Sequence, residues 1–116
     1  MKKYIIILGL FSLASNAEIF RVSTTAEFRA ALATASSNNE DDIIMLANGT
    51  YKTTDDEGGT FEYIGEEPNS LDIVGENEAS NVTLDGDGAH RVLSLKTLSD
   101  TNYHDPYIFK VSRLTI

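Results

Sequence analysis

The sequence contains no cysteine. The chain can therefore form no disulfide bond and offers no cysteine for a lipid anchor. Small exported domains often compensate for a thin hydrophobic core with disulfides. This chain must obtain its stability elsewhere, and stacked repeats are one source of a continuous core.

Basic residues are scarce. Nine lysines and arginines stand against 18 aspartates and glutamates, a net charge of −9. Removal of residues 1–17, which include two of the lysines, would leave a net charge of −11. Such a surface disfavours nucleic acid, anionic lipid and polyanionic substrates unless a cation bridges them. It favours solubility, and the carboxylates could also associate with divalent ions.

The N-terminus has the layout of a secretory signal peptide. Two lysines open the chain, the segment from Tyr4 to Leu13 is mostly apolar, and small residues stand at Ser15 and Ala17. The apolar run is too short to span a bilayer. We predict a signal peptide at residues 1–17 and a domain at 18–116 that is secreted, periplasmic or on the cell surface, without a membrane span. A buried N-terminal strand or an interfacial anchor is the alternative.

A leucine–polar–aliphatic unit recurs at near-constant spacing, at Leu71–Ile73, Leu93–Leu95 and Leu114–Ile116, with a looser copy at Ile44–Leu46. The intervals from Leu71 to Leu93 and from Leu93 to Leu114 are nearly equal. Two apolar residues around an outward one are typical of a short strand with one buried face. The recurrence predicts that the three leucines lie directly over one another in adjacent strands of a solenoid.

One amphipathic helix is predicted ahead of these strands. Thr24 and Glu27 fit a capping box, in which each side chain bonds the backbone N–H of the other residue. An apolar stripe follows at helical spacing: Phe28, Ala31, Leu32 and Ala35. We expect this helix to cover the first open end of the stack, because uncovered strand edges and core ends invite aggregation.

The remaining segments alternate between short strands and polar turns. Phe61 and Tyr63 alternate with polar residues, and Val82–Leu84 fits a strand on another face of the same coil. The acidic, glycine-rich segment Thr53–Gly59 predicts a surface loop. The chain stops at Ile116 inside a predicted strand, so we expect either a truncated stack or an open edge that pairs with another chain.

An acidic turn is the candidate metal site. Asp85 and Asp87, with Asp72 on a neighbouring coil, could bind calcium through carboxylate oxygens. The other ligands of a calcium loop are missing. Turn formation explains the same residues, because the two glycines of segment 85–88 supply positive φ and the aspartates bond their own backbone. We predict no cofactor other than this calcium.

Two histidine-containing segments are candidates for chemistry. His104 and Asp105, beside Tyr103 and Tyr107, resemble a general acid–base pair or an aromatic sugar platform. Neighbours in sequence do not usually face each other in space, and no nucleophile stands nearby. The pair His90–Arg91 could meet a substrate carboxylate or could be ordinary surface. We therefore predict no catalytic residue.

The segment Asp42–Tyr51 resembles the first coil of exported right-handed parallel β-helix proteins, which are pectate-lyase-like repeat proteins. In that family an Asp-x-Ile-x-Leu-x-x-Gly-x-Tyr pattern follows a capping helix, as it does here. Asp72–Gly75 with Val82–Gly86 resembles the next coil, and Arg113–Ile116 resembles the rung after it. The resemblance covers about residues 19–116.

The resemblance implies an all-β solenoid, a right-handed parallel β-helix with an N-terminal capping helix, truncated at its C-terminal end. The family includes polysaccharide lyases and hydrolases as well as non-catalytic surface and adhesion proteins, and its catalytic residues generally sit on later coils. Fold analogy does not establish function.

We expect a non-catalytic N-terminal segment of an exported surface or secreted binding protein. Its partners would be extracellular polysaccharide, cell-surface components or a second copy of the chain, which would pair at the open C-terminal edge. Two alternatives stay open. The chain is the start of a carbohydrate-active enzyme, or it is a remnant without independent function.

Overall fold

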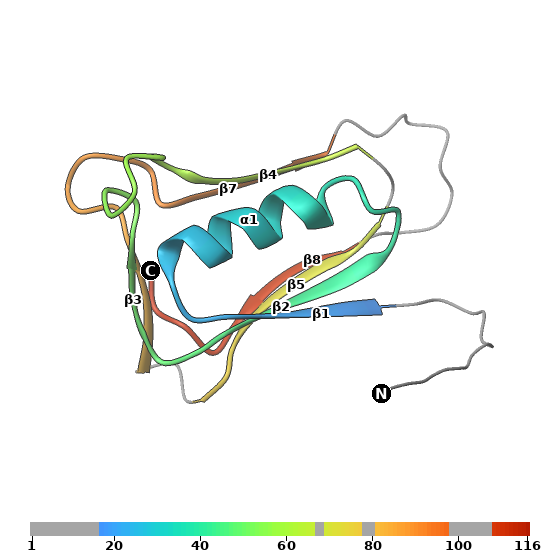
Figure 1. Cartoon of the computed structure of the whole chain (residues 1–116), viewed down its shortest axis with the longest axis horizontal. Coiled ribbons are helices and arrows are strands. Elements are labelled where there is room, and N and C mark those ends of the chain that lie inside the picture. The colour runs from blue at the N-terminus through green and yellow to red at the C-terminus, as the bar shows by residue number, and fades with distance from the viewer. Residues whose placement is uncertain (1–16, 67–68, 78–80, 98–107) are drawn as a thin grey trace, which may run out of the picture.

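The computed structural model describes residues 17–66, 69–77, 81–97 and 108–116. The described chain is mostly β-structure with one helix, α1 (Thr25–Ala35). The strands are β1 (Ala17–Val22), β2 (Asp41–Leu46), β3 (Gly49–Lys52), β4 (Phe61–Gly65), β5 (Leu71–Gly75), β6 (Val82–Asp85), β7 (Leu93–Thr97) and β8 (Phe109–Ser112). Figure 1 shows α1 lying across the space that these strands enclose.

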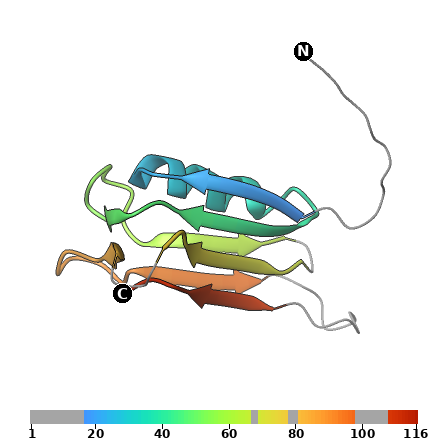
Figure 2. The same cartoon turned by 90° about the horizontal axis from the view of Figure 1, so that it is seen from below.

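The strands form three parallel sheets. The first has the order β1-β2-β5-β8, the second pairs β3 with β6, and the third pairs β4 with β7. The chain therefore visits the first, second and third sheets in turn through β2, β3 and β4, and repeats the circuit through β5, β6 and β7. A bridge between Thr83 and Thr115 continues the second sheet after β8. Figure 2 shows successive strands in chain order, with α1 at one end and β8 at the other.

The register places like residues opposite each other. Ile44 pairs with Ile73 in the first sheet, and Tyr63 pairs with Leu95 in the third. The residue numbers of these partners give the length of one full circuit of the three sheets. It takes about 30 residues of chain here, since a parallel neighbour is reached only after a crossover.

The predicted direct stacking of Leu71, Leu93 and Leu114 is wrong. Leu71 belongs to β5 in the first sheet and Leu93 to β7 in the third, so the two do not pair. Leu114 precedes Thr115, which bridges to Thr83 in the second sheet. The chain passes from β5 in the first sheet through β6 in the second to β7 in the third. The interval from Leu71 to Leu93 therefore covers two thirds of a circuit and not a full one.

Inward side chains of all three sheets and of α1 form one hydrophobic core. Its buried members are Val22, Phe28, Ala31, Leu32, Ala35, Ile44, Leu46, Tyr51, Phe61, Tyr63, Leu71, Ile73, Val82 and Leu84. The two apolar positions of the unit Ile44–Leu46 are buried, as its pattern predicts, and Tyr51 is buried as well. The hydroxyl of Tyr51 donates a hydrogen bond to the carbonyl of Ala47 at 2.7 Å, which satisfies a polar group inside the core.

The predicted helix is confirmed, with a small change at its start. The hydroxyl of Thr24 accepts from the backbone N–H of Glu27 at 3.1 Å. Glu27 in turn accepts from the N–H and hydroxyl of Ser23, at 2.8 and 3.0 Å, one residue earlier than the capping box predicts. These bonds lower the pKa of Glu27. Within the described residues, no helix is long and apolar enough to cross a membrane.

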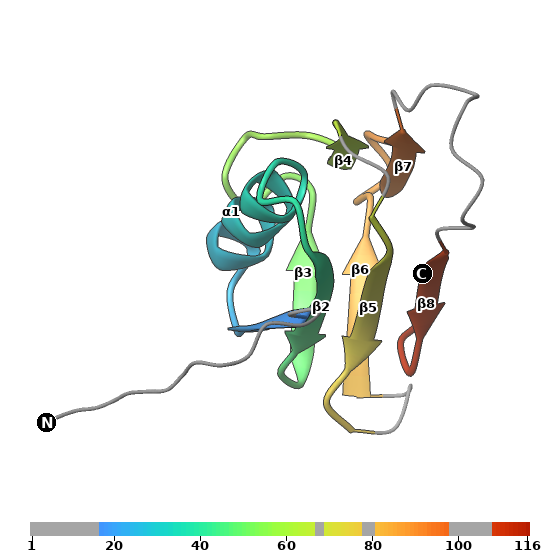
Figure 3. The ribbon, with the colours of Figure 1, turned by 90° about the vertical axis from the view of Figure 1, so that its right-hand side faces the viewer.

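The helix closes one end of the enclosed space. The ring of Phe28 lies 4.8 Å from that of Phe61 and 6.1 Å from that of Tyr51, measured between centroids. All three side chains are buried. Figure 3 shows α1 at one side of the stacked strands and β8 at the other. The lid predicted from the apolar stripe is therefore present.

At the end of the stack opposite α1, the inward side chains of β7 and β8 are less buried than those of the preceding circuit. Leu93 and Leu95 of β7 and Phe109 of β8 are only partly buried, although each pairs with a buried residue of the preceding circuit. Val111 of β8 is 36% exposed, whereas its partner Ile73 is fully buried. Burial of inward side chains therefore decreases from the α1 end of the stack to the β8 end.

The acidic loop after β3 is exposed, as predicted, but it is fastened to α1. The guanidinium of Arg29 donates to both carboxylate oxygens of Asp56 at 2.9 Å, and to the carbonyls of Gly59 and Thr60 at 3.0 and 3.2 Å. Its central carbon lies 4.7 Å from the ring centroid of Phe61, which adds a cation–π contact.

A second bond ties the same loop to the first turn of α1. The hydroxyl of Thr25 donates to a carboxylate oxygen of Asp55 at 2.8 Å. Thr25 is itself buried. The loop and the helix are therefore held together at two points.

The paired hydrogen bonds between Arg29 and Asp56, called the clamp below, predict a contribution to stability that is lost in acid. Hydrogen bonding to Arg29 lowers the pKa of Asp56 below its ordinary value of 3.8. A carboxylate with a lowered folded pKa stabilises the fold above the unfolded pKa and loses this effect as pH falls through the folded pKa. We expect Asp56→Asn to unfold at lower urea than wild type at about pH 6, and the difference to shrink towards about pH 3.

Glu62→Gln is the matched control. Glu62 faces Lys96 at 3.8 Å in an exposed pair, which contributes little to stability. Its urea midpoint should follow the wild type across the same range. Parallel curves for wild type and Asp56→Asn would show that the clamp carries no charge-dependent stability.

Candidate functional site

The predicted acidic turn is held by its own hydrogen bonds. The carboxylate of Asp85 accepts from the backbone N–H of Asp87 at 2.7 Å. The hydroxyl of Thr54 donates to the carboxylate of Asp87 at 2.9 Å. Each aspartate therefore already has a structural role, as the turn interpretation predicts.

Of the two glycines in this turn, Gly88 has the predicted positive φ and Gly86 does not. Positive φ occurs at Asp87, at 54°, and at Gly88, at 70°, but not at Gly86. Gly86 is needed for close packing, because a Cβ there would lie 2.3 Å from the carbonyl oxygen of His90. Aspartate tolerates the left-handed region better than most residues, which explains its place at the first of the two positions.

The structure does not place Asp72 in the same turn. Asp72 lies on β5 in the first sheet, whereas Asp85 ends β6 in the second. Within the part of the chain that the structure describes, no three acidic or histidine side chains form a group that could hold a metal ion. Calcium binding at Asp85 and Asp87 stays a prediction.

His90 joins this turn to the start of the acidic loop. Its Nδ1 lies 3.1 Å from the hydroxyl of Thr53, which also donates to the carbonyl of Gly86 at 3.2 Å. Thr53 is completely buried. Its hydroxyl therefore serves a structural bond and is not available to an external substrate. The sequence interpretation missed Thr53, since a lone threonine in a polar loop gives no signal of burial. Arg91 is exposed.

The second histidine segment lies outside the described residues. It includes His104, Asp105, Tyr103 and Tyr107. The acid–base or aromatic-platform interpretation of these residues stays a prediction.

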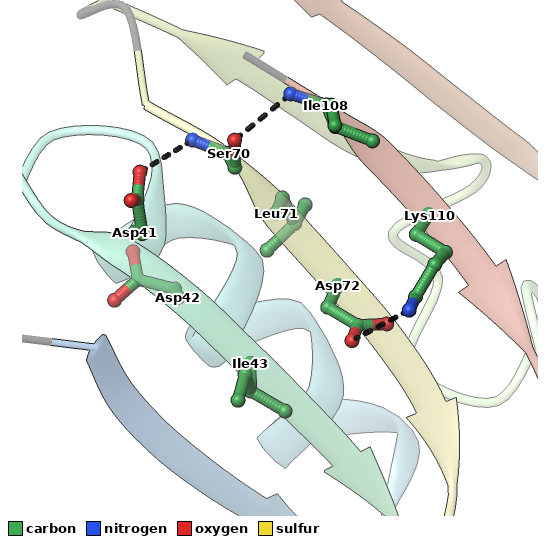
Figure 4. Close-up of a pocket in the computed structure, with 8 residues that line it drawn as sticks. All are labelled: Asp41, Asp42, Ile43, Ser70, Leu71, Asp72, Ile108 and Lys110. Carbon is green, nitrogen blue, oxygen red and sulfur yellow. Dashed lines mark hydrogen bonds and ion pairs between the residues drawn. The ribbon is translucent and has the colours of Figure 1, made fainter.

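A hollow of about 330 Å³ lies on the outer face of the first sheet, where β2, β5 and β8 begin (Figure 4). Its lining residues are Asp41, Asp42, Ile43, Ser70, Leu71, Asp72, Ile108 and Lys110. Three of them share one row, because Asp72 pairs with Ile43 on one side and with Lys110 on the other. Parallel pairing thus gathers residues that are far apart in the sequence.

One end of the hollow is organised by backbone and hydroxyl groups. The carboxylate of Asp41 accepts from the backbone N–H of Ser70 at 2.8 Å. The hydroxyl oxygen of Ser70 accepts from the backbone N–H of Ile108 at 2.8 Å. Figure 4 shows these two bonds in line across the three strands. They fix the positions of the strand starts.

Asp72 is the least satisfied group of the hollow. Its Oδ2 lies 3.9 Å from the ammonium of Lys110, whose side chain is 65% exposed. Its Oδ1 is buried and has no hydrogen-bond partner among the residues that the structure describes. A buried acceptor without a donor costs on the order of 1–3 kcal/mol. The exposed pair with Lys110 offsets little of this cost.

Asp42 occupies the first position of the Asp-x-Ile-x-Leu pattern. It is buried, and its carboxylate accepts from the side-chain amide of Asn38 at 3.0 Å. Burial raises the pKa of Asp42 above its ordinary value. Its role is therefore local, since it bonds the segment that leads from α1 into β2.

The hollow is suited to binding. Its residues supply carboxylate acceptors, one hydroxyl, one ammonium group and the apolar side chains of Ile43 and Ile108. Among the lining residues that the structure describes there is no histidine that could activate Ser70 as a nucleophile. Sequence analysis singled out Asp72 as a possible calcium ligand, and Asp42, Ile43 and Leu71 only as parts of predicted strands.

The turn and calcium interpretations of Asp87 predict different responses. We expect Asp87→Asn to change the free energy of unfolding by less than about 0.5 kcal/mol, because asparagine keeps an acceptor and tolerates positive φ. Calcium at about 5 mM, above the range of weak extracellular sites, should leave the melting temperature of both proteins unchanged. A calcium-dependent rise in wild type that Asp87→Asn abolishes would establish a metal site.

Comparisons with models of protein families, with curated proteins and with solved structures give no match to this chain. The resemblance to exported parallel β-helix proteins therefore stays a prediction, and its support comes from the strand pairing and the sequence pattern.

Proposed function

We propose that residues 18–116 form the capped first coils of an exported right-handed parallel β-helix. In this role the segment is non-catalytic and provides the closed end of a surface or secreted binding or adhesion protein. The observation that carries the proposal is the difference between the two ends of the stack. One end is sealed by α1, and the other ends in half-buried inward side chains.

The strand pairing supports the coil. Two consecutive circuits visit the three sheets in the same order, and each strand of the second circuit pairs in parallel with its counterpart in the first. Parallel strands need a crossover of a dozen or more residues, and the other two sheets provide it here in place of a helix. This arrangement replaces the refuted stacking of Leu71 on Leu93 as the basis of the solenoid.

The lid supports a terminal position. Solenoid repeats bury their faces against neighbours, and end repeats need a distinct cap. The inward residues Ile44 and Phe61 of the first circuit are fully buried, and the ring of Phe28 on α1 packs against that of Phe61. The side of the stack that carries α1 is therefore unsuited to a further coil.

The β8 end supports the addition of another strand layer. Leu95 and Phe109 are in register with buried residues and would be covered by one more layer. A second copy of this chain can supply that layer by pairing its own β8 end in a symmetric dimer. Pairing of the β8 end with the α1 end of another copy is disfavoured, because α1 lies over the core there.

The proposed location and partners follow from the N-terminus and the charge. An export signal at residues 1–17 would place the domain outside the cytoplasm. There it could bind extracellular polysaccharide or cell-surface components. The net charge of −11 that remains after removal of residues 1–17 favours neutral or cationic partners over anionic ones.

Substitution at the open end tests the proposal. Val111→Lys places a charge at an inward position of β8 and should weaken self-association of the full chain by at least about tenfold, because a buried charge opposes strand-layer contact. The measurement is light-scattering mass against protein concentration. Ile19→Lys is the control, since Ile19 is 48% exposed on β1 at the other edge of the same sheet. Identical mass curves for wild type and Val111→Lys would refute an open end.

An ultraviolet assay tests the enzyme alternative. A polysaccharide lyase releases unsaturated sugars that absorb in the ultraviolet, and a hydrolase releases reducing ends. We expect the purified chain to produce neither from a panel of extracellular polysaccharides, because the described residues of the hollow include no acid–base pair beside a nucleophile. Sustained product formation that is lost in Asp72→Asn would replace the binding role with catalysis.

A further inference from the structure

We propose that removal of residues 1–17 creates an ion pair within this fold, in which the new α-ammonium group of Glu18 binds the buried carboxylate of Asp42. The inference rests on the export signal proposed above, and it gives the cleavage of that signal a structural consequence. Cleavage before Glu18 converts the single backbone N–H of this residue into a positively charged group with three donors. The strand β1 sets the position of this nitrogen, because Glu18 is its second residue.

The backbone nitrogen of Glu18 is already bonded to the carboxylate of Asp42. The two residues are partners in the parallel pairing of β1 with β2. The N–H of Glu18 donates a hydrogen bond to that carboxylate. Figure 4 shows Asp42 at the start of β2, beside β1. An ammonium group at the same nitrogen keeps this bond and adds the attraction between opposite charges at short range.

The surroundings of Asp42 favour a cation. Its side chain is buried, with 3% of the residue exposed. Burial raises the pKa of Asp42 above its ordinary value, and repulsion from Glu40 and Glu18 adds to the rise. The side-chain amide of Asn38, which donates to the carboxylate at 3.0 Å, carries no charge. On the other side of β2 the partner of Asp42 is the apolar residue Leu71.

Lys110, the basic residue in the lining of the hollow, faces a different carboxylate. Its ammonium lies 3.9 Å from the Oδ2 of Asp72 and its side chain is 65% exposed. It belongs to β8, whereas Asp42 lies two strands away on β2. An opposite charge favours ionisation of a carboxyl group when it lies within about 4–6 Å. The α-ammonium group of Glu18 meets this condition, because it arises on the strand next to Asp42.

Competitive acetylation of the exported product tests the proposal. The full chain is expressed in a secreting host, the product is recovered outside the cytoplasm, and its intact mass locates the cut. Trace acetic anhydride then labels the α-amino group only in its unprotonated form, and Glu18 is exposed to the reagent. The pH of half-maximal labelling therefore measures the pKa of the α-amino group, which is ordinarily about 7.7–8.0.

We expect the ion pair to raise this pKa, because a nearby negative charge favours the protonated amine. Labelling of the α-amino group at about pH 7 should be at least about tenfold slower than in a free peptide of residues 18–21, a difference equal to about one pH unit in the midpoint.

Two neighbouring substitutions separate the ion pair from general charge effects. Asp42→Asn removes the negative charge and keeps an oxygen for Asn38, so its α-amino group should be labelled at least about tenfold faster than that of wild type. Asp41→Asn is the matched control. Asp41 is exposed and accepts from the backbone N–H of Ser70, so its rate should stay within about twofold of wild type. Equal rates in wild type and Asp42→Asn, or an equal increase in both variants, would overturn the proposal.

Measurements on wild type alone decide the proposal if Asp42→Asn fails to fold. A labelling midpoint equal to that of the free peptide would overturn the ion pair without any variant. An intact mass that shows no cut, or a cut at another residue, would overturn the proposed export signal together with the ion pair. A cut before Glu18 with an unshifted midpoint would overturn the ion pair and leave the export signal standing.

Discussion

The packing of the Phe28 ring of α1 against Tyr51 and Phe61 is the contact on which the rest of the structure depends. In the three parallel sheets, backbone groups form hydrogen bonds between neighbouring strands. These bonds do not cover the two ends of the enclosed interior. Without a lid, the aromatic rings of Tyr51 and Phe61 would face water, and a small chain without disulfides has few other sources of stability.

Local features of this fold were predictable, and the long-range pairing was not. The cap at Thr24, the buried stripe of α1 and the inward positions of β2 follow from spacing over a few residues. The interval between Leu71 and Leu93 fits either one full circuit or two thirds of one. Only hydrogen bonds between distant strands distinguish these cases, and Ile44 opposite Ile73 shows that the full circuit is longer.

The same limit applies to the hollow. Asp72 and Lys110 are neighbours because β5 and β8 pair, and Ile43 joins them through the pairing of β2 and β5. Ile43 and Asp72 lie in the predicted strand patterns, but those patterns did not indicate which outward residues of different strands would be neighbours. The acidic turn shows the converse. Asp85 and Asp87 looked like a metal site in the sequence, yet the turn geometry alone accounts for their hydrogen bonds.

The double attachment of the acidic loop to α1 couples two segments that would otherwise move separately. Arg29 and Thr25 hold the loop from the helix side, and the same helix closes the core. Separation of α1 from the core must therefore move the acidic loop or break its bonds to Thr25 and Arg29. Loss of those bonds would in turn weaken the packing of α1 on the core. Amide exchange in both segments should then report a single opening event, and a protease that cuts near Asp56 would act as a sensor of whether the end of the stack is shut.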